Sequence, residues 1–190
     1  MDPIAKVWLF TLNESHSIIE AAFQSLWNET LTVAASYTAV RGEPHILFQS
    51  DDEPDLLAVV SGYHCMEASI DVQRAWADKL VPRLLEFITH KQLFVLHMDV
   101  NELPLDSGKI AILITEPESE PDPGFLPGKG SWAVQMPSLL VEAHDANKTT
   151  KRTWIQVATS EDAARLRLSG GTTKSFSMIM ESRVTLQDAE

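Results

Sequence analysis

Two apolar segments without polar alternation stand out in the first half of the chain, at 56–64 and 93–100. An uninterrupted run of aliphatic and β-branched residues is typical of a strand that is covered on both faces. Each run carries polar rings within it or at its end, namely Tyr63, His64 and His97. A polar ring inside such a strand costs free energy unless it is hydrogen-bonded, so these rings are the first candidates for function.

The first half of the chain alternates strand and helix patterns. Residues 6–12 are apolar at both odd and even positions, which predicts a central strand that is buried on both faces. From Ser17 onward the apolar residues recur at helical spacing, which predicts a helix. A strand with a bulge, or a hairpin, is expected over 36–49, and a second helix over 68–88. The runs at 56–63 and 93–100 complete the order β-α-β-β-α-β, which is the ferredoxin-like unit.

The second half predicts a looser copy of this order. Its most regular patterns are strands at 109–115, 153–159 and 176–184, with a short helix after Ser160. Residues 116–130 hold four prolines and three glycines and predict a lid-like loop, whereas 131–141 fits a strand, a short helix or a loop over a cavity. We therefore expect an α+β fold of two units, residues 1–103 and a degenerate second unit at 104–190.

Composition narrows the classes of partner. The formal net charge of -12 and the pI near 4.8 oppose binding to nucleic acid or anionic lipid. No segment is long and apolar enough to predict a membrane span, and the start of the chain lacks the pattern of a signal peptide, so we expect a cytoplasmic protein. The single cysteine, Cys65, excludes an intrachain disulfide, and no spacing of ligand residues predicts a metal site.

Two local patterns and the order of elements resemble a known family. The strand Val59-Val60-Ser61-Gly62-Tyr63, which ends in an aromatic residue before a helix, and the segment Leu96-His97-Met98-Asp99 are similar to the dimeric α+β barrel superfamily. That superfamily includes antibiotic-biosynthesis monooxygenase-like, stress-responsive barrel and olivetolic acid cyclase-like proteins. The order of elements is most similar to a tandem version among fungal proteins, in which two units in one chain close a barrel.

The resemblance implies a barrel with a ligand cavity and no required cofactor. Members range from cofactor-free oxygenases, cyclases, decarboxylases and dehydratases to haem-degrading enzymes and proteins without known activity, so the fold does not fix the chemistry. If the two units close one barrel within the chain, the protein can be a monomer, whereas a degenerate second unit leaves room for a homodimer.

The alternation of side chains along a strand shows which candidate catalytic residues share a face. His97 shares a face with Val95 and Asp99, and in an apolar cavity it would act as the general base. The alternative is a structural histidine that hydrogen-bonds a backbone carbonyl. Tyr63 is the preferred donor to a substrate oxygen, and His64, which points to the opposite face of the strand, is at most a secondary acid.

Five further side chains are candidates for substrate binding. Aromatic residues on one strand face can line either a cavity or the packing surface beneath helices, and the packing role is the more frequent one. A polar residue near a strand end can line the mouth of a cavity or simply be exposed. The candidates are Trp8, Phe10, His45, Ser61 and Trp132.

The leading hypothesis is a cofactor-independent enzyme of polyketide- or terpenoid-like secondary metabolism. It would bind an apolar, oxygenated small molecule in the barrel and carry out cyclisation, dehydration, decarboxylation or isomerisation by acid/base chemistry. One alternative is a non-catalytic ligand-binding or stress-related barrel. The other is a cofactor-free monooxygenase.

Overall fold

The described part of the chain forms strands and helices in the predicted order as far as β4. The computed structural model describes residues 2–39, 41–117, 121, 127–136, 153–167 and 171–183. The elements of the first unit are β1 (Ile4–Leu12), α1 (Ala21–Thr38), β2 (His45–Ser50), β3 (Leu56–Tyr63), α2 (Met66–Ala77), α3 (Val81–Phe87) and β4 (Ile88–Leu96). This is the predicted β-α-β-β-α-β order, with the second helix divided in two.

The second unit contributes four more strands. Two short 3-10 helices, η1 (Val100–Glu102) and η2 (Leu105–Ser107), lead from β4 into it. Its elements among the described residues are β5 (Lys109–Thr115), β6 (Lys129–Met136), β7 (Thr153–Thr159), η3 (Ser160–Asp162), α5 (Ala163–Arg167) and β8 (Thr172–Ser182). The lid-like loop predicted at 116–130 falls mostly outside the described residues, and its last two residues already belong to β6.

The eight strands close into one barrel in the order β1-β3-β2-β8-β5-β7-β6-β4. Within the first unit the order is β2-β3-β1-β4, and the second unit repeats it as β6-β7-β5-β8. All pairs are antiparallel, and the units join where β4 meets β6 and where β2 meets β8. The fold is therefore two ferredoxin-like units in one chain, of which the second is degenerate.

The inward face of the barrel is a packed apolar core. Side chains from strands on opposite walls form one cluster, which only the barrel interior can bring together. An eight-stranded barrel is just wide enough for its own side chains to fill. Within the described residues, buried side chains occupy the place where a ligand cavity was expected inside the barrel, among them Val7, Ile46, Phe48, Val60, Phe94, Ile112, Val157 and Phe176.

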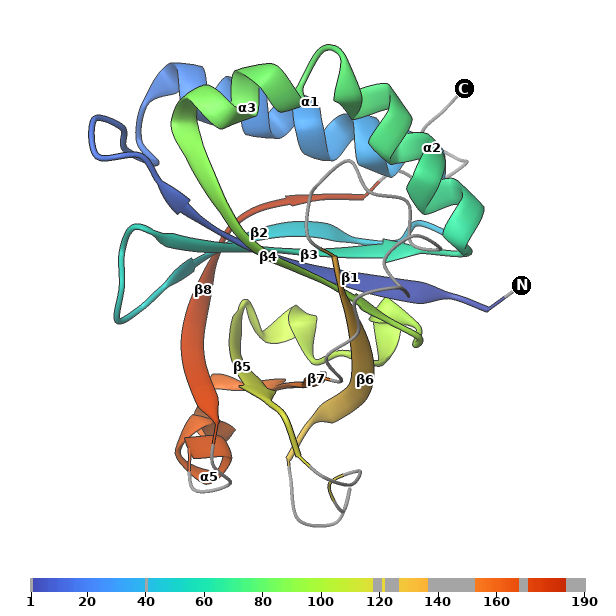
Figure 1. The fold of residues 1–190 in the computed structure, drawn as a ribbon, viewed down its shortest axis with the longest axis vertical. Helices are drawn as coiled ribbons and strands as arrows, with labels where there is room; N and C mark the ends of the chain where they lie inside the picture. The colour runs from blue at the N-terminus through green and yellow to red at the C-terminus, as the bar shows by residue number, and fades with distance from the viewer. Residues whose placement is uncertain are drawn as a thin grey trace.

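The outward face of the first unit carries the helices. In Figure 1, α1, α2 and α3 lie together over strands β1 to β4, and α5 lies at the opposite end of the molecule. Trp8 and Phe10 of β1 pack with Trp27 of α1 in a second core cluster between sheet and helices. The alternation along β1 thus sends one parity into the barrel and the other beneath the helices.

Several element boundaries differ from the sequence prediction: α1 begins at Ala21, β8 spans Thr172–Ser182, and two further differences lie close to the site. The strand or hairpin expected at 36–49 begins only at His45, because α1 continues to Thr38 and buries Ala34, Ala35 and Thr38 beneath it. Packing of this helical face outweighs the local preference for a strand. The strand expected to reach residue 100 ends at Leu96.

Candidate functional site

A row of polar side chains crosses the sheet beneath the helices. Lys6 of β1 lies opposite Ser61 of β3, and His45 of β2 lies opposite the same serine. Directly paired residues in a sheet project their side chains to the same face. Tyr63 follows two positions after Ser61 and therefore shares that face. The neighbouring row on the same face is apolar and contains Trp8 opposite Val59.

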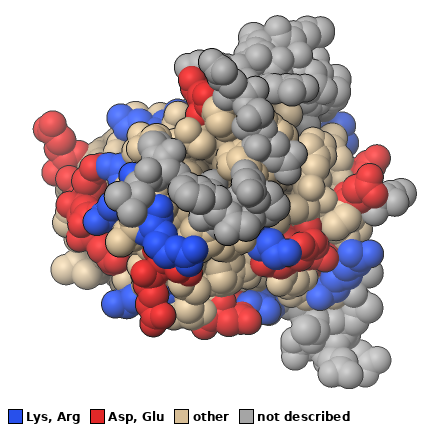
Figure 2. Space-filling model, turned by 90° about the horizontal axis from the view of Figure 1, so that it is seen from below, with Lys and Arg blue, Asp and Glu red and all other residues tan. Residues whose placement is uncertain are grey.

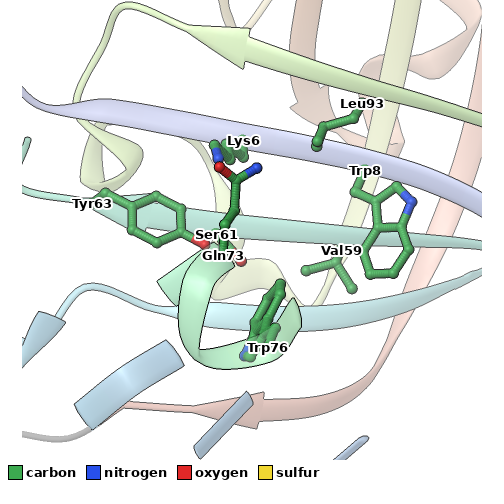
Figure 3. Close-up of a pocket in the computed structure, with 8 residues that line it drawn as sticks. All are labelled: Lys6, Trp8, Val59, Ser61, Tyr63, Gln73, Trp76 and Leu93. Carbon is green, nitrogen blue, oxygen red and sulfur yellow. The ribbon is translucent and has the colours of Figure 1, made fainter. Parts of the chain in front are cut away.

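These two rows form the floor of a pocket that α2 covers. The pocket is a small cavity of about 30 Å³ between the sheet and the helix (Figure 3). That volume holds roughly two water molecules. The floor is polar at one end and apolar at the other, and the lining residues are Lys6, Trp8, Val59, Ser61, Tyr63 and Leu93 from the sheet and Gln73 and Trp76 from α2.

Lys6 is a buried amine in this pocket. Its side chain is 5 % exposed, and its Nζ lies 5.4 Å from the centre of the Tyr63 ring. Burial lowers the pKa of Lys6 to about 7, and no charge among the described residues contributes to the shift. Figure 3 shows the amide of Gln73 directed toward this amine. Near neutral pH the Lys6 amine therefore exists in both protonation states and can accept or release a proton.

Tyr63 supplies a protonated phenol to the same pocket. The residue is 3 % exposed, and Figure 3 shows its oxygen directed toward Ser61. Burial raises the pKa of Tyr63 above its ordinary value, and the nearby Ser61 hydroxyl opposes only part of this rise. The phenol therefore stays protonated and can donate a hydrogen bond to a ligand oxygen.

His45 supports Tyr63 from behind and does not line the pocket mouth. It is fully buried, with its ring edge-on to Tyr63 at a centroid distance of 5.5 Å. Its Nε2 is hydrogen-bonded to Thr38 Oγ1 at 2.9 Å, while its Nδ1 has no partner among the described residues. Burial lowers the pKa of His45 to about 3, so the imidazole is neutral at physiological pH.

The two aromatic candidates of β1 have different surroundings. Trp8 lines the pocket, and its Nε1 donates a hydrogen bond to His90 Nδ1 at 3.0 Å. Phe10 is stacked on Trp27 at 5.0 Å with an interplanar angle of 8° and lies within the core. Of the two, Trp8 is the one that a ligand in this pocket would meet.

His97 lies outside this pocket, contrary to the expectation of a base in an apolar cavity. It is exposed and occupies a bend directly after β4. The strand stops there because Asp99 caps η1, with its Oδ1 accepting a hydrogen bond from the Asn101 backbone N–H at 2.9 Å. His97 instead borders a separate hollow of about 380 Å³ beside β6 and β7, together with Trp154.

His64 also lies apart from Tyr63, as strand parity predicts. Its Nδ1 is buried without a partner among the described residues, and it lies near the buried carboxyl group of Glu43. Burial raises the pKa of Glu43, while His64 and Arg41 act in the opposite direction. The group of Glu43 and His64 is at the end of the barrel and does not contribute to the pocket under α2.

Trp132 belongs to the second unit. It lies on β6, with its ring perpendicular to that of Trp154 of β7 at 5.5 Å. It does not line the pocket that holds Lys6. The structure thus brings Trp8, Ser61 and Tyr63 together in the pocket, with His45 packed against Tyr63. It leaves Phe10, His64, His97 and Trp132 outside the pocket.

Sequence reasoning missed Lys6 and Gln73. The sequence did contain a signal for Lys6, because Lys6, Trp8 and Phe10 lie on one face of a strand that is apolar on both faces. A lysine at such a position is either exposed at the strand end or buried without its solvation. Gln73 could not have been found, since nothing in a helical pattern shows which polar residue faces a cavity.

The surface has a mixed charge. Figure 2 shows lysines, arginines and acidic residues interspersed over the described part of the visible face. Pairs such as Lys129 with Glu102 and Arg167 with Asp52 account for some of this pattern. Among the described residues no helix is long and apolar enough to cross a membrane, and no cluster of three ligand residues could hold a metal ion.

Comparison with known proteins identifies the fold. No family model matches the sequence, and no curated protein does. A candidate monooxygenase of Fusobacterium nucleatum is similar over 96% of this chain and 94% of its own, with a TM-score of 0.53 and 9% identity. An anthrone oxidase-like protein has the same TM-score of 0.53 and the same coverage of 96% and 94%, at 10% identity.

A candidate chlorite dismutase is similar over 94% of this chain and 96% of its own, with a TM-score of 0.53 and 7% identity. At these identities the likeness concerns the fold and not the chemistry. The chain therefore has the dimeric α+β barrel fold, with both halves of the barrel supplied by one polypeptide.

Proposed function

We propose that this protein is a cofactor-independent enzyme that performs acid/base chemistry on an apolar, oxygenated small molecule. The reaction site is the pocket between the sheet and α2, with Lys6 as the proton acceptor and Tyr63 as the donor. The observation that carries the proposal is a buried amine beside a buried phenol at one end of an apolar pocket.

The two groups match the needs of an enolisable carbonyl compound. The neutral amine of Lys6 takes a proton from the carbon next to the carbonyl. The phenol of Tyr63, which lies beside Ser61, donates a hydrogen bond to the oxygen on which negative charge develops. In a water-poor pocket these interactions are stronger than in solution. Isomerisation, cyclisation, dehydration and decarboxylation of such compounds share this enolate-like intermediate.

The apolar end of the pocket determines the substrate class. Trp8, Val59, Leu93 and Trp76 offer aromatic and aliphatic surface without charge. A planar or hydrocarbon portion of the substrate would bury its surface there, at roughly 25 cal/mol per Å². This is consistent with a polyketide- or terpenoid-like substrate of secondary metabolism.

Deuterium uptake tests the assignment. Aryl ketones and 1,3-diketones are incubated with the protein in D₂O, and exchange at the carbon next to the carbonyl is followed by NMR. Because a proton-transfer group contributes on the order of 10²–10⁴-fold, Lys6→Met should lower the exchange rate by about that factor, and Tyr63→Phe should also lower it.

His97→Ala is the matched control, because His97 is a titratable group outside the pocket. It should exchange at the wild-type rate. Full activity in Lys6→Met would contradict the proposal, and loss of activity in His97→Ala alone would place the chemistry at the hollow beside β6 and β7.

The closed state of the pocket favours one alternative, a ligand-binding barrel without turnover. A cavity of about 30 Å³ is far smaller than a ligand-sized pocket of roughly 300–1,000 Å³, so Gln73 and Trp76 must move before any substrate enters. Quenching of tryptophan fluorescence by ligands that undergo no exchange would identify binding alone.

Product that forms only in the presence of oxygen would identify a cofactor-free monooxygenase.

The closed barrel also bears on assembly. Because β4–β6 and β2–β8 pairing completes the barrel within one chain, no second copy is needed to cover a sheet edge. We propose a monomer that works in the cytoplasm, and a dimer in size-exclusion chromatography with light scattering would correct this.

A further inference from the structure

The amine of Lys6 has a second chemical capacity that proton transfer does not use. A primary amine that is neutral, buried and free of a carboxylate partner is a nucleophile toward carbonyl carbon. The neutral fraction of Lys6 meets these conditions, since burial is the cause of its lowered pKa and no charge among the described residues holds the proton in place.

The neighbours of Lys6 supply what addition to a carbonyl requires. The Tyr63 phenol lies on the same side of the sheet, with the amine nitrogen 5.4 Å from its ring centre. It can donate to the carbonyl oxygen as the new bond forms. Ser61 lies directly opposite Lys6, and the Tyr63 oxygen is directed toward it (Figure 3), so the three groups lie together at the polar end of the pocket.

We propose that Lys6 forms an imine with apolar aldehydes, which are held covalently in the pocket beneath α2. The proposal rests on the same pocket as the proposed function and specifies its ligand class. Aldehydes are favoured over ketones because their carbonyl carbon carries one hydrogen, which suits a cavity as narrow as this one.

The step balances without a cofactor. The nitrogen lone pair of Lys6 attacks the carbonyl carbon, a C–N bond forms, and the carbonyl electron pair moves to oxygen, which takes a proton from the phenol. The ammonium nitrogen then loses a proton, which returns to the phenolate. The nitrogen lone pair of the carbinolamine forms the C=N bond as the C–O bond breaks, and the departing hydroxide takes up the remaining N–H proton and leaves as water. The net reaction is one aldehyde plus one amine to one imine plus one water.

The selectivity for Lys6 over other lysines follows from the fraction of each amine that is neutral. With a pKa of about 7, about half of the Lys6 amines are neutral at pH 7, compared with roughly 3 in 10⁴ for a lysine at the ordinary 10.5. The neutral fraction is thus about 10³-fold larger. Burial restricts access and removes part of this advantage, so we expect Lys6 to react at least about 10-fold faster than an exposed lysine.

Reductive trapping tests the proposal on the full chain. Benzaldehyde is added at pH 7, and sodium borohydride is then added to deliver hydride to the imine carbon, while solvent supplies the proton on nitrogen. Peptide mass mapping should find one benzyl group on Lys6 before any on the exposed Lys79, Lys91 or Lys109. The rate at Lys6 should increase with pH and level off above about 7.

Two variants serve as controls for the labelling experiment. Lys6→Met should lose the fast labelling and retain the slow labelling of exposed lysines, and Lys79→Met should label like the wild type. Labelling of exposed lysines with Lys6 unmodified would overturn the proposal. Deuterium exchange that depends on Lys6 without trapping leaves the acid/base function standing while refuting the imine, whereas trapping without exchange refutes the acid/base function alone.

Discussion

Replacing the buried Lys6 with methionine should change how stability depends on pH. Lys6→Met keeps a side chain of similar length and removes a charge that the surroundings do not compensate. Burying an unpaired charge costs more free energy than burying an apolar group of the same size. We therefore expect the variant to be more stable than the wild type at pH 6 and this advantage to shrink as the pH rises.

The magnitude follows from the two pKa values of Lys6. In the unfolded chain the amine titrates near its ordinary 10.5, whereas in the folded protein it titrates at about 7. Between these values the unfolded state binds the proton and the folded state does not, so the free energy of unfolding of the wild type increases with pH. The slope is ~1.4 kcal/mol per pH unit, and the full effect is about 5 kcal/mol. Below pH 7 both states bind the proton, and the destabilisation is complete.

Chemical denaturation measures this difference. Unfolding in urea, followed by tryptophan fluorescence at intervals between pH 6 and 9.5, gives the free energy of unfolding of both proteins. The stability advantage of Lys6→Met should fall by about 2.5 kcal/mol between pH 7.5 and 9.5, because only the wild type gains stability from this titration. Lys79→Met, which removes an exposed lysine, should follow the wild-type curve.

A constant difference between Lys6→Met and the wild type across this range would refute the reasoning. It would mean that Lys6 titrates alike in the folded and unfolded states. The amine would then be protonated at neutral pH, and neither its role as a proton acceptor nor its role as a nucleophile would hold.

Two further predictions concern buried groups near the pocket. Because burial lowers the pKa of His45 from 6.5 to about 3, the unfolded state takes up the proton first as the pH falls, and the wild type should lose about 2 kcal/mol between pH 7 and 5. His45→Phe should lack this loss in acid denaturation curves, and an unchanged loss would exclude His45 as its source. Gly62→Ala should cost about 1–3 kcal/mol, since a Cβ there would lie 2.1 Å from Val100 Cγ1. Adding Val100→Ala should restore part of that loss in thermal melts, and a melting temperature of Gly62→Ala equal to the wild type would contradict the close contact.

The position of His97 shows where sequence reasoning reached its limit. The spacing of two residues places His97 on the same strand face as Val95, and Val95 does pack on the helix-facing side, away from the barrel core. The end of the strand was not readable, because it depends on the turn that Asp99 caps before η1. His97 is the first residue after the strand, and it is exposed.

The sequence by itself determined the order of elements in the first unit and the pairing of side chains by face. Period-two alternation placed Ser61 with Tyr63 and separated Tyr63 from His64, since neighbouring residues on a strand must point to opposite sides. The acidic net charge of the protein and the apolar character of its strands can likewise be read from the sequence without knowledge of contacts between distant residues.

Only the tertiary structure decided which face became core and which became a site. Both faces of β1 and β3 are apolar, so no local pattern distinguishes the barrel interior from the surface beneath the helices. Closure of eight strands filled the interior with side chains from both units. Strand register then placed Lys6 opposite Ser61, and the packing of α2 enclosed them. These are contacts between residues far apart in the chain, and their free energy depends on the whole barrel, which no short window of sequence contains.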